Sequence, residues 1–157
     1  LKKLCKHTKK SNFVFTRYCG NQITKDSMYK QYRIIMSLAK IDDWKKFLGV
    51  TSKRHEHKAQ YPVIPFAKNH PIMNGFPEKW VTPKDELYVI EKLWPNSKPL
   101  AFSVSERTGK KHAVIWTNEF GKARVFGTTY GHSDETFKDQ VFINLLARGL
   151  VWAVGKL

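Results

Sequence analysis

The end of the chain has the clearest hydrophobic pattern. Ser133 is a good N-cap residue, and Asp134 and Glu135 after it would lie in a first helical turn, where the helix dipole favours negative charge. The pattern predicts a helix that begins after Ser133 and ends at Gly155. Apolar residues recur at helical spacing between these two points in two series: Phe137, Val141 and Leu145, and Phe142, Leu146 and Leu150.

Residues 29–47 also have a helical pattern, in two pieces. Asp42 and Asp43 stand between the pieces, where an N-cap is expected, and Gly49 is suited to end the second piece. The apolar positions of the two pieces are Ile34, Ile35 and Leu38, followed by Trp44, Phe47 and Leu48.

Short runs rich in β-branched and aromatic residues indicate strands. The link between the last two runs is short and contains Gly121, which predicts a β-hairpin. Residues 51–83 contain five prolines and are predicted to be loop. Strands interleaved with terminal helices indicate a layered α/β domain. The predicted strands are residues 12–16, 86–90, 100–105, 113–117 and 124–128.

The length of 157 residues predicts a single domain over residues 1–157, with one core. No apolar run reaches the roughly 18 residues that a membrane-spanning helix needs, so we expect no membrane partner. Two cysteines, Cys5 and Cys19, are too few for a disulfide framework and favour a reducing compartment. The sequence therefore predicts a cytoplasmic protein. It does not determine the oligomeric state.

The charge is strongly basic and unevenly distributed. The chain has 28 Lys and Arg against 13 Asp and Glu, and residues 1–60 hold 15 of the basic and four of the acidic residues. This asymmetry is compatible with RNA or another polyanion as a partner of residues 1–60. A solvated lysine-rich surface explains the same charge, because the lysines are scattered among acids and aromatics.

His132 is the main candidate for chemistry. It lies in the loop between the predicted strand 124–128 and the last helix, and open α/β sheets bind ligands where strands lead into such loops. Imidazole has a reference pKa of about 6.5 and can act there as acid, base or metal ligand. A histidine that only makes a hydrogen bond to a neighbouring loop would fit the same place.

Asp85 and Glu86 form an acidic pair at the start of a predicted strand. Carboxylates can bind sugar hydroxyls, ligate a metal or transfer protons. Neighbouring strand residues face opposite sides, so we expect one of the two in a given site, and Glu86 has the same parity as Tyr88. Asp85 could instead accept a hydrogen bond from the preceding turn.

Other histidines and one cysteine are weaker candidates. His55 and His57 would share a face of an extended segment and could bind a divalent metal, although two histidines in a basic loop are more often solvated. His70 precedes Pro71, which favours extended geometry there, and a structural role is as well supported as a chemical one. A triad of Cys19, His132 and Asp134 is not favoured, because no glycine stands two residues before the cysteine. No cofactor is predicted with certainty.

Several short motifs occur in a characteristic order between residues 69 and 155. They are His70-Pro-Ile72, Asp85-Glu-Leu-Tyr88, Trp116, Phe120-Gly-Lys122, Arg124-Val-Phe126, Gly131-His132, Phe137, Arg148-Gly149 and Trp152-Ala153. In this order the motifs resemble the ThuA-like (trehalose utilisation) family. The resemblance implies a flavodoxin-like sheet of the class I glutamine amidotransferase type that lacks the N-terminal part of the family domain. It also implies a link to the catabolism of trehalose or keto-sugars.

Together with the resemblance, these residues predict a domain that binds or transforms a small carbohydrate. His132, Glu86 and Asp85 are its candidate catalytic residues, and proton transfer by His132 next to a sugar carbonyl is the simplest chemistry. The candidate substrate-binding residues are Tyr88, Trp116 as a stacking face, and His70. The alternatives are a non-catalytic basic protein that binds RNA or another polyanion, and a subunit of a larger assembly.

Overall fold

The computed structural model describes residues 42–157, which lie within one compact unit, Lys40–Leu157. A five-stranded sheet has the strand order β3-β2-β5-β6-β7, and a two-stranded sheet pairs β1 with β4. The strands are β1 (Val50–His55), β2 (Pro62–Pro65), β3 (Trp80–Val81), β4 (Tyr88–Leu93), β5 (Lys98–Val104), β6 (Lys111–Phe120) and β7 (Ala123–Thr128). The helices are α2 (Asp42–Leu48) and α3 (Gln140–Ala153), with 3-10 turns η2 (Pro71–Met73) and η3 (Thr136–Lys138).

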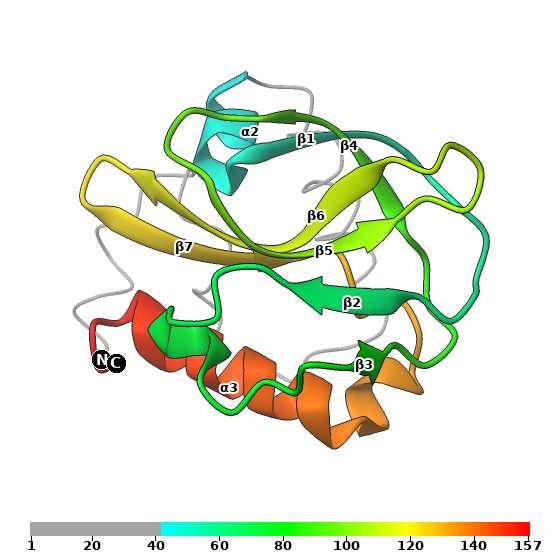
Figure 1. Cartoon of the computed structure of the whole chain (residues 1–157). Helices are drawn as coiled ribbons and strands as arrows, with labels where there is room; N and C mark the ends of the chain where they lie inside the picture. Colours follow the sequence, from blue (N-terminus) through cyan, green and yellow to red (C-terminus); the bar gives the residue numbers. More distant parts are fainter. Residues whose placement is uncertain (1–41) are drawn as a thin grey trace, which may run out of the picture. The chain divides into compact units, whose positions relative to one another are not determined.

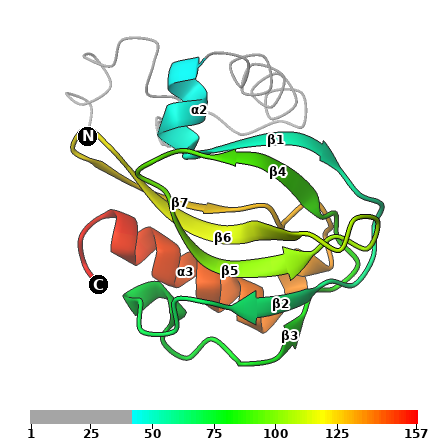
Figure 2. The same cartoon turned by 45° about the horizontal axis from the view of Figure 1, so that its top comes forward.

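The five-stranded sheet is covered on both faces. Helix α3 lies along one face, and α2 with the β1–β4 pair lies over the other (Figures 1 and 2). Burial of seven successive residues of β6, residues 112–118, reflects this double cover. The main hydrophobic cluster joins residues of the sheet, among them Leu100 and Ile115, with Phe142, Leu145 and Trp152 of α3.

The predicted hairpin is confirmed. Strands β6 and β7 pair in antiparallel register up to Phe120 opposite Ala123, so Gly121 and Lys122 form a two-residue link. Gly121 has a φ of 59°, which a residue with a side chain adopts only at a cost. The predicted strands at residues 86–90 and 100–105 correspond to β4 and β5.

The last helix begins later than its sequence pattern predicts. Its N-cap is Asp139, whose Oδ1 accepts a hydrogen bond from the Phe142 amide at 3.0 Å. The prediction that Ser133 caps this helix is therefore wrong, because residues 131–135 form a loop and η3 follows it. Gly155 ends α3 as predicted, since its amide bonds to Trp152 O while the Lys156 amide bonds to Val151 O, which is a Schellman motif.

Gly49 ends α2 as predicted, with a φ of 83° and an amide that bonds to Lys45 O at 2.8 Å. The prediction of loop over residues 51–83 is wrong in part, because β1, β2 and β3 lie there. The predicted strand 12–16 and the first helical piece after residue 29 lie outside the described residues.

Every strand pairing described in residues 42–157 is antiparallel. A layered α/β domain is thus confirmed, while the parallel sheet of a flavodoxin-like fold is not among these pairings. Within residues 42–157, no helix has the length and apolar character needed to cross a membrane.

Candidate functional site

Asp85 is fully buried beneath residues 131–136, the loop before η3 together with the first residue of η3, which we call the Gly131 loop. Its Oδ2 accepts hydrogen bonds from the Gly131 amide at 2.9 Å and the Thr136 hydroxyl at 2.6 Å. Its Oδ1 accepts from the amides of Glu86 at 2.8 Å and His132 at 3.3 Å. Four donors therefore occupy this carboxylate, which fixes the Gly131 loop and has no access to a ligand.

The backbone of the Gly131 loop also requires a glycine. Gly131 has a φ of 114°, and a Cβ placed there would lie 3.2 Å from Phe142 and 3.3 Å from Phe137. Asp85 and Gly131 together set the direction in which His132 leaves the loop.

Glu86 follows Asp85 in the chain, and its carboxylate approaches two imidazoles. Its Oε2 is 3.5 Å from Nδ1 of His132 and 3.5 Å from Nδ1 of His55. The Glu86 side chain is 12% exposed, while those of His55 and His132 are 55% and 44% exposed. We call these three residues the Glu86 cluster. It is a mostly buried carboxylate with two imidazoles that open to solvent.

The carboxylate favours one arrangement of the His132 ring. An acceptor beside Nδ1 favours a proton on that nitrogen, which leaves the Nε2 lone pair as the basic site of the neutral ring. No hydrogen bond to Nε2 of His132 forms within residues 42–157. The arrangement can therefore take a proton from a ligand at Nε2 and stabilise the resulting imidazolium through Glu86.

Tyr88 stands next to this cluster. It is the register partner of His55 in the β1–β4 pair, and the two ring centroids are 5.6 Å apart. His55 thus contacts both Glu86 and Tyr88, the two residues whose shared parity predicted one site.

A second buried carboxylate supports the end of β1. Glu56 is 2% exposed, and its Oε1 accepts from Ser105 Oγ at 2.6 Å and from Arg54 at 3.5 Å. Burial alone would raise the pKa of Glu56, but the Ser105 hydrogen bond and the Arg54 charge outweigh it and lower the pKa. Glu56 therefore remains ionised and ties the turn after β5 to the residue next to His55.

Two buried phenols lie near these carboxylates. Burial, with the charges of Glu106, Glu56 and Glu86, raises the pKa of Tyr61 to about 12. Burial also raises the pKa of Tyr130, whose hydroxyl donates to Ser103 Oγ at 2.8 Å. Tyr61 donates to the carbonyl of His57 at 2.7 Å. Both phenols therefore act as neutral structural donors.

His57 does not join His55 in a metal site. Its Nε2 lies 3.7 Å from Glu106, whereas His55 faces Glu86, so the two rings approach different carboxylates. Among the described residues, no group of three or more His, Cys, Asp or Glu side chains could hold a metal ion. The spacing of the two histidines in the sequence did not reveal this divergence.

The structure places Trp116 in the core, where it cannot offer a face to a sugar. It is 5% exposed, its indole N–H donates to Leu48 O at 2.8 Å, and it covers Gly127. His70 caps η2, where its Nδ1 accepts from the Ile72 amide at 3.2 Å, and its ring lies 5.5 Å from that of Trp152. These contacts give both residues structural roles.

Asp85, predicted to be catalytic, has a structural place as well, because all four of its acceptor positions face protein donors. Sequence reasoning gave His55 either a metal or a solvated position and missed its approach to Glu86. The sequence could indicate only that His55 lies in an extended segment. Its pairing with Tyr88 joins residues 33 positions apart, so no local pattern reveals it.

Fold and cluster together define a small α/β domain with a carboxylate–imidazole site beside the loop that precedes its last helix. The sequence profile of ThuA, described as trehalose utilisation, matches residues 35–153. The chain therefore belongs to the ThuA family, as its motifs predicted. Membership supports a role related to trehalose utilisation at the level of the family.

Two solved structures share the fold. A putative ThuA-like protein from Parabacteroides merdae ATCC 43184 has 20% sequence identity and a TM-score of 0.63, with coverage of 88% of this chain and 68% of that one. A putative ThuA-like protein from Bacteroides uniformis ATCC 8492 has 20% identity and a TM-score of 0.59, with coverage of 74% and 53%. The chain thus spans about half of the second protein. No curated protein matches the chain.

Proposed function

We propose that this chain binds a small carbohydrate of the trehalose or keto-sugar type at the Glu86 cluster and transfers a proton there through His132. One observation carries the proposal. A single carboxylate oxygen of Glu86 lies 3.5 Å from Nδ1 of two imidazoles that come from different parts of the fold. The family's link to trehalose utilisation supports a sugar as the ligand.

Proton transfer next to a carbonyl suits this arrangement. A C–H bond beside the keto group breaks, the proton goes to Nε2 of His132, and the electron pair moves to the carbonyl oxygen as an enolate. The Glu86 carboxylate compensates the charge of the imidazolium. The proton returns to the former carbonyl carbon, and the proton of the neighbouring hydroxyl passes to the former carbonyl oxygen. These two transfers complete the isomerisation of an α-hydroxy ketone without any other reactant.

His55 and Tyr88 would bind the substrate. The exposed edge of the His55 imidazole can donate to or accept from a sugar hydroxyl, and the Tyr88 ring beside it can contact an apolar face of the sugar. Asp85 acts only through the loop that it holds, so it is a positioning residue in this proposal.

Sugar binding and proton exchange test the proposal together. The protein is titrated calorimetrically with trehalose, glucose and a 3-keto-glucoside, and exchange of the ketone's neighbouring C–H is followed by NMR in D2O. We expect binding of at least one of these sugars. We expect exchange to fall about 10²- to 10⁴-fold in His132→Ala, as is typical when a general base is lost.

His57→Ala is the matched control, because His57 is an exposed imidazole two residues after His55 that faces Glu106 instead of Glu86. Full exchange in His132→Ala, or an equal loss in His57→Ala, would contradict the proposed role of His132. Binding that survives with no exchange in the unchanged protein would leave a sugar-binding domain without catalysis.

Polyanion binding through residues 1–60 is the other outcome of such a test. Of the five basic residues among residues 42–60, four lie within ion-pair distance of a carboxylate, which weakens this part as a polyanion surface. Salt-sensitive retention on heparin without any sugar binding would favour this alternative.

A flavodoxin-like arrangement and a cytoplasmic location remain parts of the proposal.

A further inference from the structure

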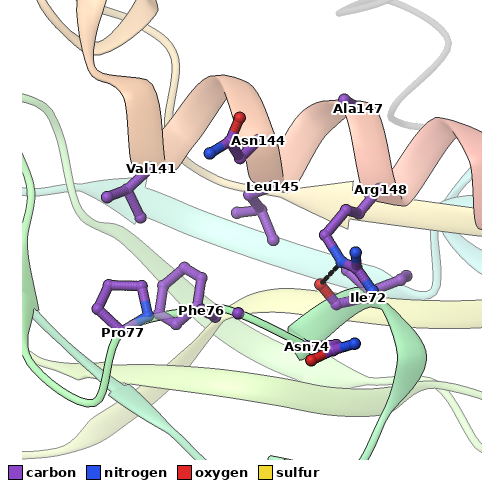
Figure 3. Close-up of a pocket in the computed structure, with 10 residues that line it drawn as sticks. Ile72, Asn74, Phe76, Pro77, Val141, Asn144, Leu145, Ala147 and Arg148 are labelled. Carbon is purple, nitrogen blue, oxygen red and sulfur yellow. Dashed lines mark hydrogen bonds between the residues drawn. The ribbon is translucent and has the colours of Figure 1, made fainter.

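A cavity of about 310 Å³ lies between η2 and α3 (Figure 3). None of its lining residues belongs to the Glu86 cluster or contributes to the Gly131 loop. At roughly 30 Å³ per water molecule, the cavity has room for about ten waters, or a ligand with a similar number of non-hydrogen atoms. This size is at the lower end of the range for small-molecule sites.

The walls of the cavity are mainly apolar. Phe76 and Pro77 lie side by side at one end, and Val141 and Leu145 extend toward them from α3 (Figure 3). Ile72 completes the apolar wall near the other end. A ligand therefore needs an apolar body.

Polar groups stand at the opposite end and the rim. Asn74 and Asn144 carry side-chain amides, and Asn144 uses its Oδ1 to accept from Gln140 at 2.9 Å, so its amide N–H groups stay available. Arg148 is the one charged residue of the lining, and no carboxylate lines the cavity. The electrostatic balance favours an anionic group.

Arg148 is oriented before any ligand arrives. Its Nε donates to Ile72 O at 3.1 Å, and its Nη2 donates to Pro71 O. Its Nη1 makes no hydrogen bond to any of residues 42–157. A guanidinium has five N–H donors, so two backbone carbonyls hold the group in place while further donors remain for a carboxylate. Preorganisation of this kind lowers the entropic cost of binding.

From this arrangement we infer that the η2–α3 cavity binds a small monocarboxylate with an apolar body of about ten non-hydrogen atoms in total. The carboxylate accepts from Arg148 and the asparagine amides, and the apolar body fills the space between Phe76 and Leu145. A ligand of this size with one charged contact typically binds with a Kd on the order of 1 mM. The site is independent of the proposed sugar site.

The test uses phenylacetate, which has the required size, and its neutral isostere phenylacetamide. Titration of the full chain is followed by chemical-shift changes of the Arg148 side chain and the Leu145 methyl groups. We expect saturable binding of phenylacetate and binding of phenylacetamide that is about tenfold weaker, because the charged contact is lost. Equal affinity for both probes would overturn the assignment of an anion site.

Two variants on the same helix separate the cavity from the general surface. Ala147 lines the cavity at an exposed position, so Ala147→Trp should obstruct it without disturbing the Arg148 hydrogen bonds. Leu150 is exposed on α3 outside the lining, so Leu150→Trp is the matched control. We expect binding to be lost in the first variant and kept in the second. Unchanged binding in Ala147→Trp, or no saturable binding of phenylacetate to the unchanged protein, would refute the proposal.

Discussion

The two sides of the Gly131 loop use neighbouring carboxylates in opposite ways. On the inner side, Asp85 is fully buried and accepts four hydrogen bonds from protein donors. On the outer side, Glu86 faces two imidazoles at 3.5 Å, and both rings reach solvent. The difference shows that the number of protein donors already bound to a carboxylate, more than its residue type, decides whether it can act on a ligand.

Removing the charge on the inner side should have the largest effect. In Asp85→Asn, an NH2 group replaces one of the two acceptor oxygens of the carboxylate. This group faces N–H or O–H donors, so these buried donors lose their hydrogen-bond acceptor. We expect the free energy of unfolding to fall by about 2–4 kcal/mol in urea titrations. Glu91→Gln is the control, since Glu91 makes only a surface ion pair with Lys53 at 3.9 Å. If Asp85→Asn lost no more stability than Glu91→Gln, the structural role of the buried carboxylate would be contradicted.

The backbone of the loop should be the next most sensitive feature. Gly131→Ala introduces a Cβ at a φ of 114° and within 3.2–3.3 Å of two phenylalanine rings. We expect thermal or urea unfolding to show a cost of about 2–3 kcal/mol. Gly109→Ala has a φ of 66° and open space around the new methyl, so about 1 kcal/mol is expected there. Equal costs would show that the loop tolerates repacking around Phe137 and Phe142.

The outer carboxylate should contribute little to stability. Glu86→Gln keeps the size of the side chain and breaks two charge contacts of 3.5 Å with imidazoles that are about half exposed, so we expect a loss of about 1 kcal/mol or less. The same variant should reduce proton exchange on a bound keto-sugar, because the imidazolium of His132 loses its counter-charge. A destabilisation as large as that of Asp85→Asn would mean that both sides of the loop are structural.

His70 provides the smallest effect and a contrast among the imidazoles. Burial, together with the charges of Arg124 and Lys98, lowers the pKa of His70 in the folded protein. The unfolded chain then binds a proton more readily, so the contribution of His70 to stability is present above about pH 6.5 and is lost as the pH falls through the lower folded value. Protonation of Nδ1 also removes the acceptor for the Ile72 amide.

His70→Asn tests this pH dependence, because asparagine can accept the same cap hydrogen bond and does not titrate. Urea unfolding between about pH 7 and about pH 5 should show a smaller loss of stability in the variant than in the unchanged protein. Parallel curves would indicate that other groups dominate acid sensitivity in this range.

Local sequence patterns predicted much of the sheet but not the inner side of the site. Strands β5, β6 and β7 and the turn at Gly121 follow from alternation and turn chemistry within short segments. The start of α3 does not, because Ser133 satisfies the local rule for an N-cap while Asp85, 46 residues from Gly131, binds the loop amides. The helix therefore begins later, with Asp139 as its N-cap.

The candidate site divides in the same way. The sequence indicated Glu86 and His132 separately, through an acidic pair and a loop before a helix. It could not show that His55 joins them, since that depends on the register of β1 against β4. Strands β1, β2 and β3 were missed because their segment is rich in proline, a residue that β2 carries at both ends.

The contact between Trp116 and Gly127 has a consequence for how β7 keeps its place at the edge of the sheet. The two residues are direct register partners, and a Cβ on Gly127 would lie 2.4 Å from the indole. On the other face, Phe126 occupies the space that Gly149 of α3 leaves open, with a Cβ there only 2.3 Å from the ring. A slip of β7 by one residue would bring Phe126 against the indole and remove the ring from the helix, so these two glycine–aromatic contacts act as a lock on strand alignment.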